Sequence, residues 1–156
     1  MSKLIYITNM SLDGYIEDET GSHAWTNPDQ VFEFITELLR PMGTHLYGRR
    51  LYETMVYWAA PVESYPTEHR DVARVWQKGE KIVFSRTLTA AKTCNTRIEH
   101  EFAPEVIRKL KRESEHVGRG KPAFRTGLRL ALELLETRRF GTGVIHVRCR
   151  IRGGTS

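Results

Sequence analysis

The chain contains few cysteines and no long apolar run, and each shortage excludes a class of protein. Only Cys94 and Cys149 are present, far apart and outside any metal-ligand spacing, so we expect neither a disulfide framework nor a zinc site. No apolar segment approaches the roughly 20 residues that cross a bilayer, and the first residues lead into a strand pattern instead of a secretion signal. We therefore expect a cytosolic protein that binds no metal and enters no membrane.

Hydrolytic groupings are also lacking. The six histidines form no cluster, and no Ser/His/Asp or Cys/His set is recognisable. Apolar residues make up 40% of the chain and charged residues 28%, as in ordinary globular proteins. A length of 156 residues suits one domain with a substantial core, and no repeat or linker divides it. We predict a single domain over residues 1–156.

Acidic residues are scarce in the last forty positions. Residues 1–116 hold 15 Lys and Arg against 17 Asp and Glu, whereas residues 117–156 hold nine against two. Such a break is typical of a nucleic-acid-binding tail, an anion site or a segment of separate origin. Residues 117–156 therefore form an atypical, basic part of the predicted domain.

What the chain does contain is an alternation of strand and helix patterns. Segments rich in β-branched and aromatic residues predict strands, at 3–9, 44–47, 81–85 and, more weakly, 95–100. Apolar residues at helical spacing predict helices, at 28–40, 50–56, 67–77 and 104–113. This order predicts an α/β fold of three layers, in which a mostly parallel central sheet carries helices on both faces.

Polar loops follow three of the predicted strands. These loops carry Asp13, Gly48 and Ser85. Because ligands of parallel sheets bind at the carboxyl ends of the strands, topology alone predicts that the three loops gather around one site.

The most informative loop, at residues 48–53, reads GRRLYE. Gly48 lets the backbone approach a phosphate closely, and free N–H groups at a helix start point toward an anion. Arg49 and Arg50 add positive charge and forked donors. The motif therefore predicts a phosphate site, and an ordinary helix start with solvated arginines is the alternative.

A second polar set follows the next strand. Ser85, Arg86 and Thr87 offer two hydroxyls and a guanidinium, which suit a ribose 2′-phosphate. This set predicts NADPH in preference to NADH as the cofactor. A plain polar turn is the alternative.

Four short motifs occur in the order seen in one known family. They read SLDGYI at 11–16, GRRLYE at 48–53, YW at 57–58 and VFSRTL at 83–88. On these residues the chain resembles the dihydrofolate-reductase-like family, which includes the reductase domain of the riboflavin-biosynthesis deaminase/reductase. The resemblance runs from about residue 3 to residue 116.

The resemblance implies a dihydrofolate-reductase-like fold and a set of cofactor contacts. The loop after the first strand lies over the nicotinamide, and the two later loops meet the phosphates and the adenosine end. A pair of glycines near residue 118 closes the pyrophosphate site in the family, although Arg119 separates the two glycines here. The implied cofactor-binding residues are Thr8, Gly14, Ile16, Gly48, Arg49, Arg50, Ser85, Arg86, Thr87, Gly118 and Gly120.

Asp13 is the predicted catalytic residue. Its carboxylate would orient a heterocycle or assist proton delivery while the nicotinamide supplies hydride. Asp-Gly is also a common turn pair, so shaping the loop is the alternative role. With Asp13, three aromatic residues are candidates for contacting a flat substrate, and core packing is their alternative; they are Trp25, Tyr52 and Trp58.

The last forty residues depart from the family. Apolar spacing predicts an amphipathic helix over 124–135, and strict alternation predicts a strand over 145–151. The sequence RRFGT at 138–142 stands where the family carries a different turn, and the chain stops soon after its last two glycines. Two explanations fit: a divergent, shortened family member, or a shift of the reading frame near residue 117.

The leading interpretation is an NADPH-dependent reductase that transfers hydride to a small heterocycle, pterin-like or ribosylaminopyrimidine-like. The family often pairs through sheet edges, so we expect a homodimer. The first alternative is a catalytically silent member that binds a nucleotide or only dimerises. A nucleic-acid binder that uses the basic segment ranks last, because its one support is the charge break at residue 117.

Overall fold

The computed structural model describes residues 3–11, 15–16, 19–20, 29–113, 116–120 and 131–152. The chain forms two compact units, residues 1–121 and 122–156, and each is described by itself. The predictions for Asp13, Gly14 and Trp25 lie outside the described residues. No helix among the described residues is long and apolar enough to span a bilayer.

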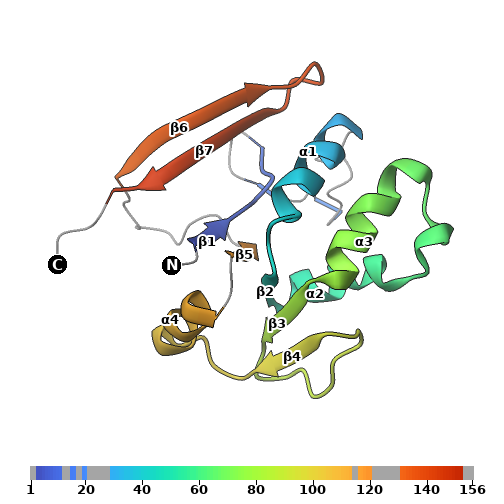
Figure 1. The fold of residues 1–156 in the computed structure, drawn as a ribbon, viewed down its shortest axis with the longest axis vertical. Coiled ribbons are helices and arrows are strands. Elements are labelled where there is room, and N and C mark those ends of the chain that lie inside the picture. Colours follow the sequence, from blue (N-terminus) through green and yellow to red (C-terminus); the bar gives the residue numbers. More distant parts are fainter. Residues whose placement is uncertain are drawn as a thin grey trace. The chain divides into compact units, whose positions relative to one another are not determined.

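The first unit is built on a sheet of five parallel strands (Figure 1). In spatial order these are β1 (Lys3–Tyr6), β5 (His116–Gly120), β2 (Thr44–Gly48), β3 (Glu80–Phe84) and β4 (Thr96–Glu99). β2 and β3 run in register, so that Leu46 lies beside Ile82 and Gly48 beside Phe84. Parallel strands need crossover connections. Helices supply them from β1 to β2, from β2 to β3 and from β4 to β5, whereas a segment without a helix, residues 85–95, joins β3 to β4.

Within the described residues, four helices lie between the strands of this sheet. They are α1 (Asp29–Leu39), α2 (Arg49–Met55), α3 (Arg70–Lys78) and α4 (Pro104–Glu113). Three 3₁₀ turns lie between α2 and α3, namely η2 (Val56–Ala59), η3 (Val62–Ser64) and η4 (Thr67–His69). The bounds of α4 are those that its apolar spacing predicts.

The core lies on both faces of the sheet, because neighbouring strand residues point to opposite sides. On one face, Tyr47 and Val83 pack against Trp76 of α3 and Tyr52 of α2, and apolar residues of α1 join them. On the other face, a second cluster joins the sheet to α4; its buried members are Leu46, Ile82, Ile107 and Leu110. The predicted three-layer α/β fold is therefore confirmed.

Two basic side chains are buried on the α3 face of the sheet. Lys81 is 1% exposed, and its Nζ donates to the carbonyl oxygens of Trp76 and Gln77 at 3.0 and 3.2 Å. The ammonium thus satisfies carbonyl groups at the end of α3, where a cation also suits the helix dipole. His45 is 2% exposed, and its Nε2 has no hydrogen-bond partner among the described residues.

The described part of the second unit is an antiparallel hairpin of β6 (Leu132–Arg139) and β7 (Ile145–Ile151). In the turn, Gly143 has φ +90°, a conformation that favours glycine. One hairpin face is apolar and exposed; its large side chains are Leu132, Leu134, Ile145, Val147 and Ile151. The opposite face carries the ion pairs Glu133–Arg150 and Glu136–Arg148, at 3.8 and 3.6 Å.

The hairpin corrects one prediction and confirms another. The strand predicted over 145–151 is present. The helix predicted over 124–135 is wrong for residues 132–135, which belong to β6. The partner strand explains the difference, because Leu132 and Leu134 lie directly opposite Ile151 and Cys149. A strand partner satisfies backbone groups along the whole segment and so overrides a local helical spacing.

Candidate cofactor site

The two predicted phosphate loops lie side by side at one edge of the sheet. β2 ends at Gly48 and β3 at Phe84, and these residues are paired in the ladder. On the other side of β2, Gly120 of β5 lies beside Tyr47, so the carboxyl end of β5 reaches the same edge. The structure thus brings three predicted cofactor segments together, as the topology implies.

A hydrogen bond from Arg49 joins the two loops directly. Its Nη1 donates to Thr87 Oγ1 at 2.8 Å, and its Nε donates to Glu53 Oε1 at 2.9 Å. The Arg49 side chain keeps 47% of its surface exposed. The guanidinium is therefore fixed at two points while its other N–H groups stay accessible.

Gly48 is not required by the fold. Its φ of −79° suits any residue, and a Cβ built on it would meet nothing within 4 Å. No side chain caps the start of α2. An exposed glycine beside uncapped N–H groups leaves room for the backbone to approach an anion closely.

Ser85 shapes its loop from within. Its side chain is buried, and its Oγ accepts hydrogen bonds from the backbone N–H groups of Thr87 and Leu88 at 3.2 and 3.0 Å. Its backbone carbonyl lies 3.1 Å from Nδ1 of His100. The Ser85 hydroxyl oxygen is therefore occupied by hydrogen bonds within the turn. The exposed side chains next to it are those of Arg86 and Thr87.

Arg50 and Arg86 supply two further cations. Both are exposed, and neither pairs with an acidic group among the residues that the structure describes. They follow the ends of adjacent strands and are next in sequence to Arg49 and Thr87, which form the link between the loops. Guanidinium groups are suited to forked contacts with phosphate oxygens.

The segments after β1 are described only in part. Thr8 follows β1 and is half-buried, with its hydroxyl 3.4 Å from the carbonyl of Asn9. Ser11 and Tyr15 flank the predicted Asp13-Gly14 pair and bond to each other through Ser11 Oγ at 2.9 Å and Ser11 N at 2.8 Å. Ile16 is half-buried, and Gly118 lies within β5 between β1 and β2.

Two predicted substrate residues are buried. Tyr52 is 0% exposed, and its hydroxyl accepts from the backbone N–H of Lys92 at 2.8 Å. Trp58 lies in an aromatic cluster, with its ring centroid 5.3 Å from that of Tyr65 and 6.1 Å from that of Phe32. Their burial favours the core-packing alternative that the sequence also allows.

Glu53 is a site residue that sequence reasoning missed. It stands four residues after Arg49 within the GRRLYE motif, on the same face of α2. The spacing of opposite charges was therefore a readable signal for this pair. The bond from Arg49 to Thr87 had no such signal, because 38 residues separate the two.

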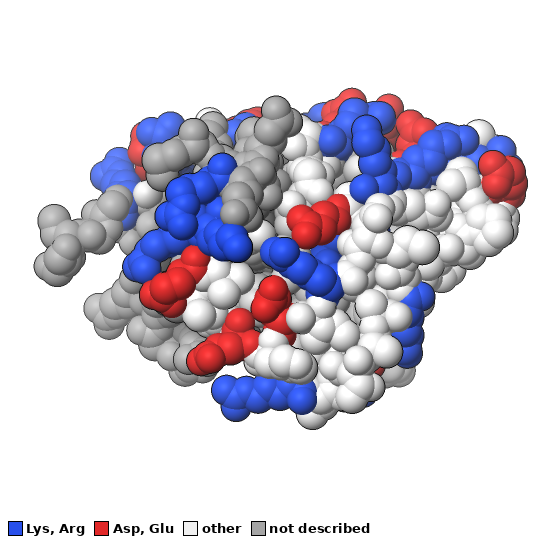
Figure 2. All heavy atoms as spheres, turned by 60° about the horizontal axis from the view of Figure 1, so that its bottom comes forward, with Lys and Arg blue, Asp and Glu red and all other residues white. Residues whose placement is uncertain are grey.

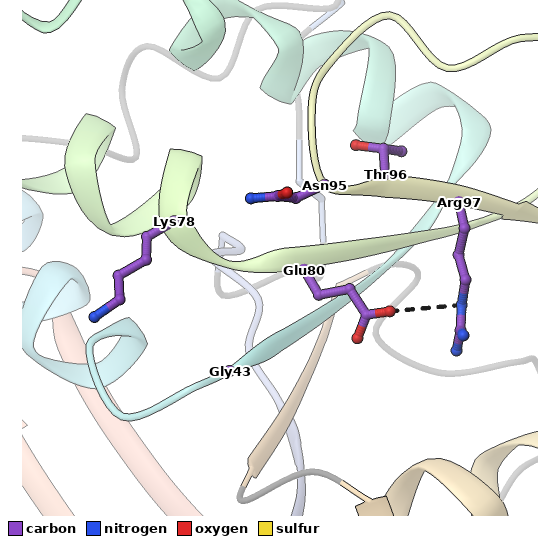
Figure 3. A pocket seen from close by; sticks show the side chains of 6 residues that line it. All are labelled: Gly43, Lys78, Glu80, Asn95, Thr96 and Arg97. Atoms are coloured by element: carbon purple, nitrogen blue, oxygen red, sulfur yellow. Dashed lines mark ion pairs between the residues drawn. The ribbon is translucent and has the colours of Figure 1, made fainter.

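A hollow of about 480 Å³ lies at the opposite ends of the strands (Figure 3). Glu80 and Arg97 face each other in it, with Nε and Oε1 3.7 Å apart. The six lining residues are Gly43, Lys78, Glu80, Asn95, Thr96 and Arg97. Since these lie at the amino ends of β2, β3 and β4, the hollow is separate from the candidate site. The described residues include no group of three His, Cys, Asp or Glu side chains placed to hold a metal.

Comparison with protein families confirms the resemblance drawn from the motifs. The profile described as the RibD C-terminal domain matches residues 2–140. The match therefore includes the first part of the basic segment that begins at residue 117. A search of curated protein sequences finds no match to the chain.

Solved structures show the same fold at low sequence identity. A protein from Shewanella sp. PV-4, provisionally assigned to riboflavin biosynthesis, is similar with a TM-score of 0.70 and 14% identity, over 98% of this chain and 100% of that one. A pyrimidine reductase-like protein from Corynebacterium diphtheriae is similar with a TM-score of 0.65 and 9% identity, over 98% and 93%.

A third similar structure is longer than this chain. It is the diaminohydroxyphosphoribosylaminopyrimidine deaminase/5-amino-6-(5-phosphoribosylamino)uracil reductase from Thermotoga maritima, with a TM-score of 0.61 and 13% identity. The similarity covers 97% of this chain and 57% of that protein. The chain therefore corresponds to about half of that two-function protein.

Proposed function

Because the chain belongs to the family of RibD C-terminal domains, we propose that it is a cytosolic NADPH-dependent reductase. Its substrate is a small heterocycle, ribosylaminopyrimidine-like or pterin-like, which accepts hydride from the nicotinamide. One similar structure is named a pyrimidine reductase-like protein and another includes a 5-amino-6-(5-phosphoribosylamino)uracil reductase in its name, and these names support the substrate class.

The observation that carries the proposal is the link between the two loops. The Arg49–Thr87 hydrogen bond joins the segment after β2 to the segment after β3, at the edge where parallel sheets bind ligands. Next to this link in the sequence are the unobstructed Gly48 and the exposed Arg50 and Arg86, which pair with no acidic group among the described residues. The end formed by Gly48 and Arg49 suits the pyrophosphate of a dinucleotide, and the end formed by Arg86 and Thr87 suits a 2′-phosphate.

The cofactor supplies the hydride, and the chain supplies binding and orientation. Arg49 and Arg50 hold the pyrophosphate beside the open backbone of Gly48. Arg86 and Thr87 hold the 2′-phosphate and so favour NADPH over NADH. Asp13 orients the heterocycle or assists proton delivery, as the resemblance implies.

A parallel titration of the folded protein with NADPH and NADH tests the cofactor. Tighter binding of NADPH supports the proposal, and a folded protein that binds neither overturns it. A panel of pterins and ribosylaminopyrimidines then tests the reaction through the loss of NADPH absorbance. Binding without reduction of any member would favour the catalytically silent alternative.

Gly48→Ala is expected to weaken NADPH binding by about 1 kcal/mol or more, because the added methyl group obstructs a close approach to phosphate. The melting temperature should stay near that of the wild type, since the methyl group meets nothing within 4 Å. Gly43→Ala is the matched control, because Gly43 is equally open but precedes β2 at its other end. Equal affinities of the two variants would contradict the assignment of Gly48.

Arg86→Ala is expected to narrow the preference for NADPH over NADH. The lost contact is a charged hydrogen bond to the 2′-phosphate, which only NADPH carries, and such bonds are worth about 1.5 to 3 kcal/mol. The ratio of the two dissociation constants is the measurement. Arg97→Ala, at the amino edge of the sheet, is the control. An unaltered ratio in Arg86→Ala would place the 2′-phosphate elsewhere.

We also propose that the chain forms a homodimer. The exposed apolar face of the β6–β7 hairpin is surface of the kind that marks interaction sites. The basic segment gives less support to nucleic-acid binding, because its two glutamates pair with Arg148 and Arg150. On the face drawn in Figure 2, acidic side chains also lie among the basic ones. Sedimentation analysis tests the dimer.

A further inference from the structure

We propose that Glu53 is a positioning residue, which holds the Arg49 guanidinium in place for a cofactor phosphate. The inference rests on the proposed function and assigns a role to a side chain that does not itself meet the ligand. Its basis is the arrangement of Glu53, Arg49 and Thr87 around the link between the two loops.

The two contacts of Arg49 engage different nitrogens. Glu53 Oε1 accepts a hydrogen bond from Nε at 2.9 Å, and Thr87 Oγ1 accepts one from Nη1 at 2.8 Å. A planar guanidinium bonded at two points has a fixed orientation, and it has five N–H donors in all. The remaining donors are therefore held in one orientation instead of being spread over many rotamers.

The second anchor is itself held firmly. Thr87 donates its backbone N–H to the Ser85 hydroxyl at 3.2 Å, and Ser85 is buried. The backbone N–H of Ser85 in turn bonds to the carbonyl of Glu99 at 2.9 Å, next to the ladder of β4. Glu53 thus holds the Arg49 side chain along its own helix, α2, while Thr87 holds it to the loop after β3.

The Glu53–Arg49 pair has little value for folding. The side chains are 34% and 47% exposed, and exposed pairs at this spacing add little to stability. A long side chain that is ordered before binding loses less freedom when the ligand arrives. Glu53 therefore acts mainly on ligand affinity, and the benefit of an already ordered arginine exceeds the repulsion between the Glu53 carboxylate and a phosphate.

The test measures the dissociation constants of NADPH and of inorganic pyrophosphate for a set of variants. Glu53→Ala is expected to weaken both roughly two- to tenfold, because one flexible side chain must then be ordered on binding. Glu53→Gln should restore most of the affinity, because its amide oxygen still accepts from Nε. Arg49→Ala and the double variant Arg49→Ala/Glu53→Ala should bind equally, because Glu53 acts through Arg49. Melting temperatures are measured in parallel.

A matched control is available on α4. Glu105 pairs with Arg108 at 3.2 Å on an exposed helix surface, as Glu53 pairs with Arg49. Glu105→Ala should leave both dissociation constants unchanged. If Glu105→Ala weakens binding as much as Glu53→Ala does, the effect is one of general charge and the inference fails.

Three other outcomes would overturn the inference. Tighter binding by Glu53→Ala and Glu53→Gln would mean that the carboxylate only competes with the ligand. A further loss in the Arg49→Ala background would mean that Glu53 does not act through Arg49. If the wild-type protein bound neither NADPH nor pyrophosphate, Arg49 would have no phosphate ligand to bind. By contrast, binding of pyrophosphate that depends on Glu53, without binding of NADPH, would support the inference and reject the proposed function.

Discussion

Replacing both Arg49 and Arg50 with alanine is expected to weaken NADPH binding by about 1 to 3 kcal/mol for each phosphate contact that is lost. Arg49 is fixed by Glu53 and Thr87, and Arg50 pairs with no acidic residue in the described part of the chain. Both follow Gly48, the open glycine at the end of β2. Calorimetric titration of the wild type, the two single variants and the double variant is the measurement.

The double variant also lowers the net charge by two, so it needs a control with the same charge. Arg108 and Arg112 are exposed on α4 and serve this purpose. Arg108→Ala/Arg112→Ala should keep the wild-type affinity if direct contacts matter. Equal losses in the two double variants, each reduced by added salt, would trace the effect to the overall charge of the protein and refute the phosphate assignment.

Much of the first unit follows from local patterns in the sequence. The helix over 104–113 and the strand at 44–47 need only apolar spacing and stop signals, and the structure has them as α4 and β2. The parallel order follows from the helices between successive strands, except for β3 and β4, which pair in parallel with no helix between them. The hairpin differs because Leu132 and Leu135 also fit a helical spacing. In the hairpin, pairing with β7 further along the chain makes this segment a strand, and no local pattern in the sequence predicts that pairing.

The candidate site likewise contains features that the sequence predicts and features that it does not. That the loops after β2 and β3 meet is a consequence of topology and could be predicted. The bonding of the Ser85 hydroxyl within its own loop could not be predicted, because it depends on how the turn that ends at Leu88 folds. For Tyr52 the sequence allows either substrate contact or core packing, and the structure shows a buried ring whose hydroxyl accepts from the Lys92 backbone.

The C-terminal hairpin bears on the origin of the basic segment. Glu133 faces Arg150 and Glu136 faces Arg148 across the ladder. On the opposite side Leu132 and Leu134 face Ile151 and Cys149, although Val147 and Ile145 face Thr137 and Arg139. An arbitrary sequence read in a shifted frame gives such matched pairs only by chance. This complementarity supports a divergent family member over a frame shift, and sequencing of the coding DNA tests the choice directly.

Acid is expected to destabilise the fold through His45 from about pH 6.5 downward, so that the loss begins above the pH at which carboxylates titrate. Burial, with the nearby Lys81 ammonium as the smaller cause, lowers the pKa of His45 to about 4. An unfolded histidine has a pKa near 6.5. Above that pH the residue is neutral in both states and stability is unaffected. Between about pH 6.5 and 4 only the unfolded chain takes up the proton, so the free energy of unfolding falls by about 3 kcal/mol in all.

The groups around His45 disfavour protonation of its ring in the folded state. Its Nε2 has no partner among the described residues, the Tyr47 ring lies parallel to it at 6.1 Å, and a Cβ at Gly79 would lie 2.5 Å from it. His45→Gln should therefore flatten the difference in stability between pH 6.5 and 4, measured by urea unfolding. His45→Asn serves in case the first variant folds poorly. A wild-type slope in a folded His45 variant would show that other groups cause the acid sensitivity.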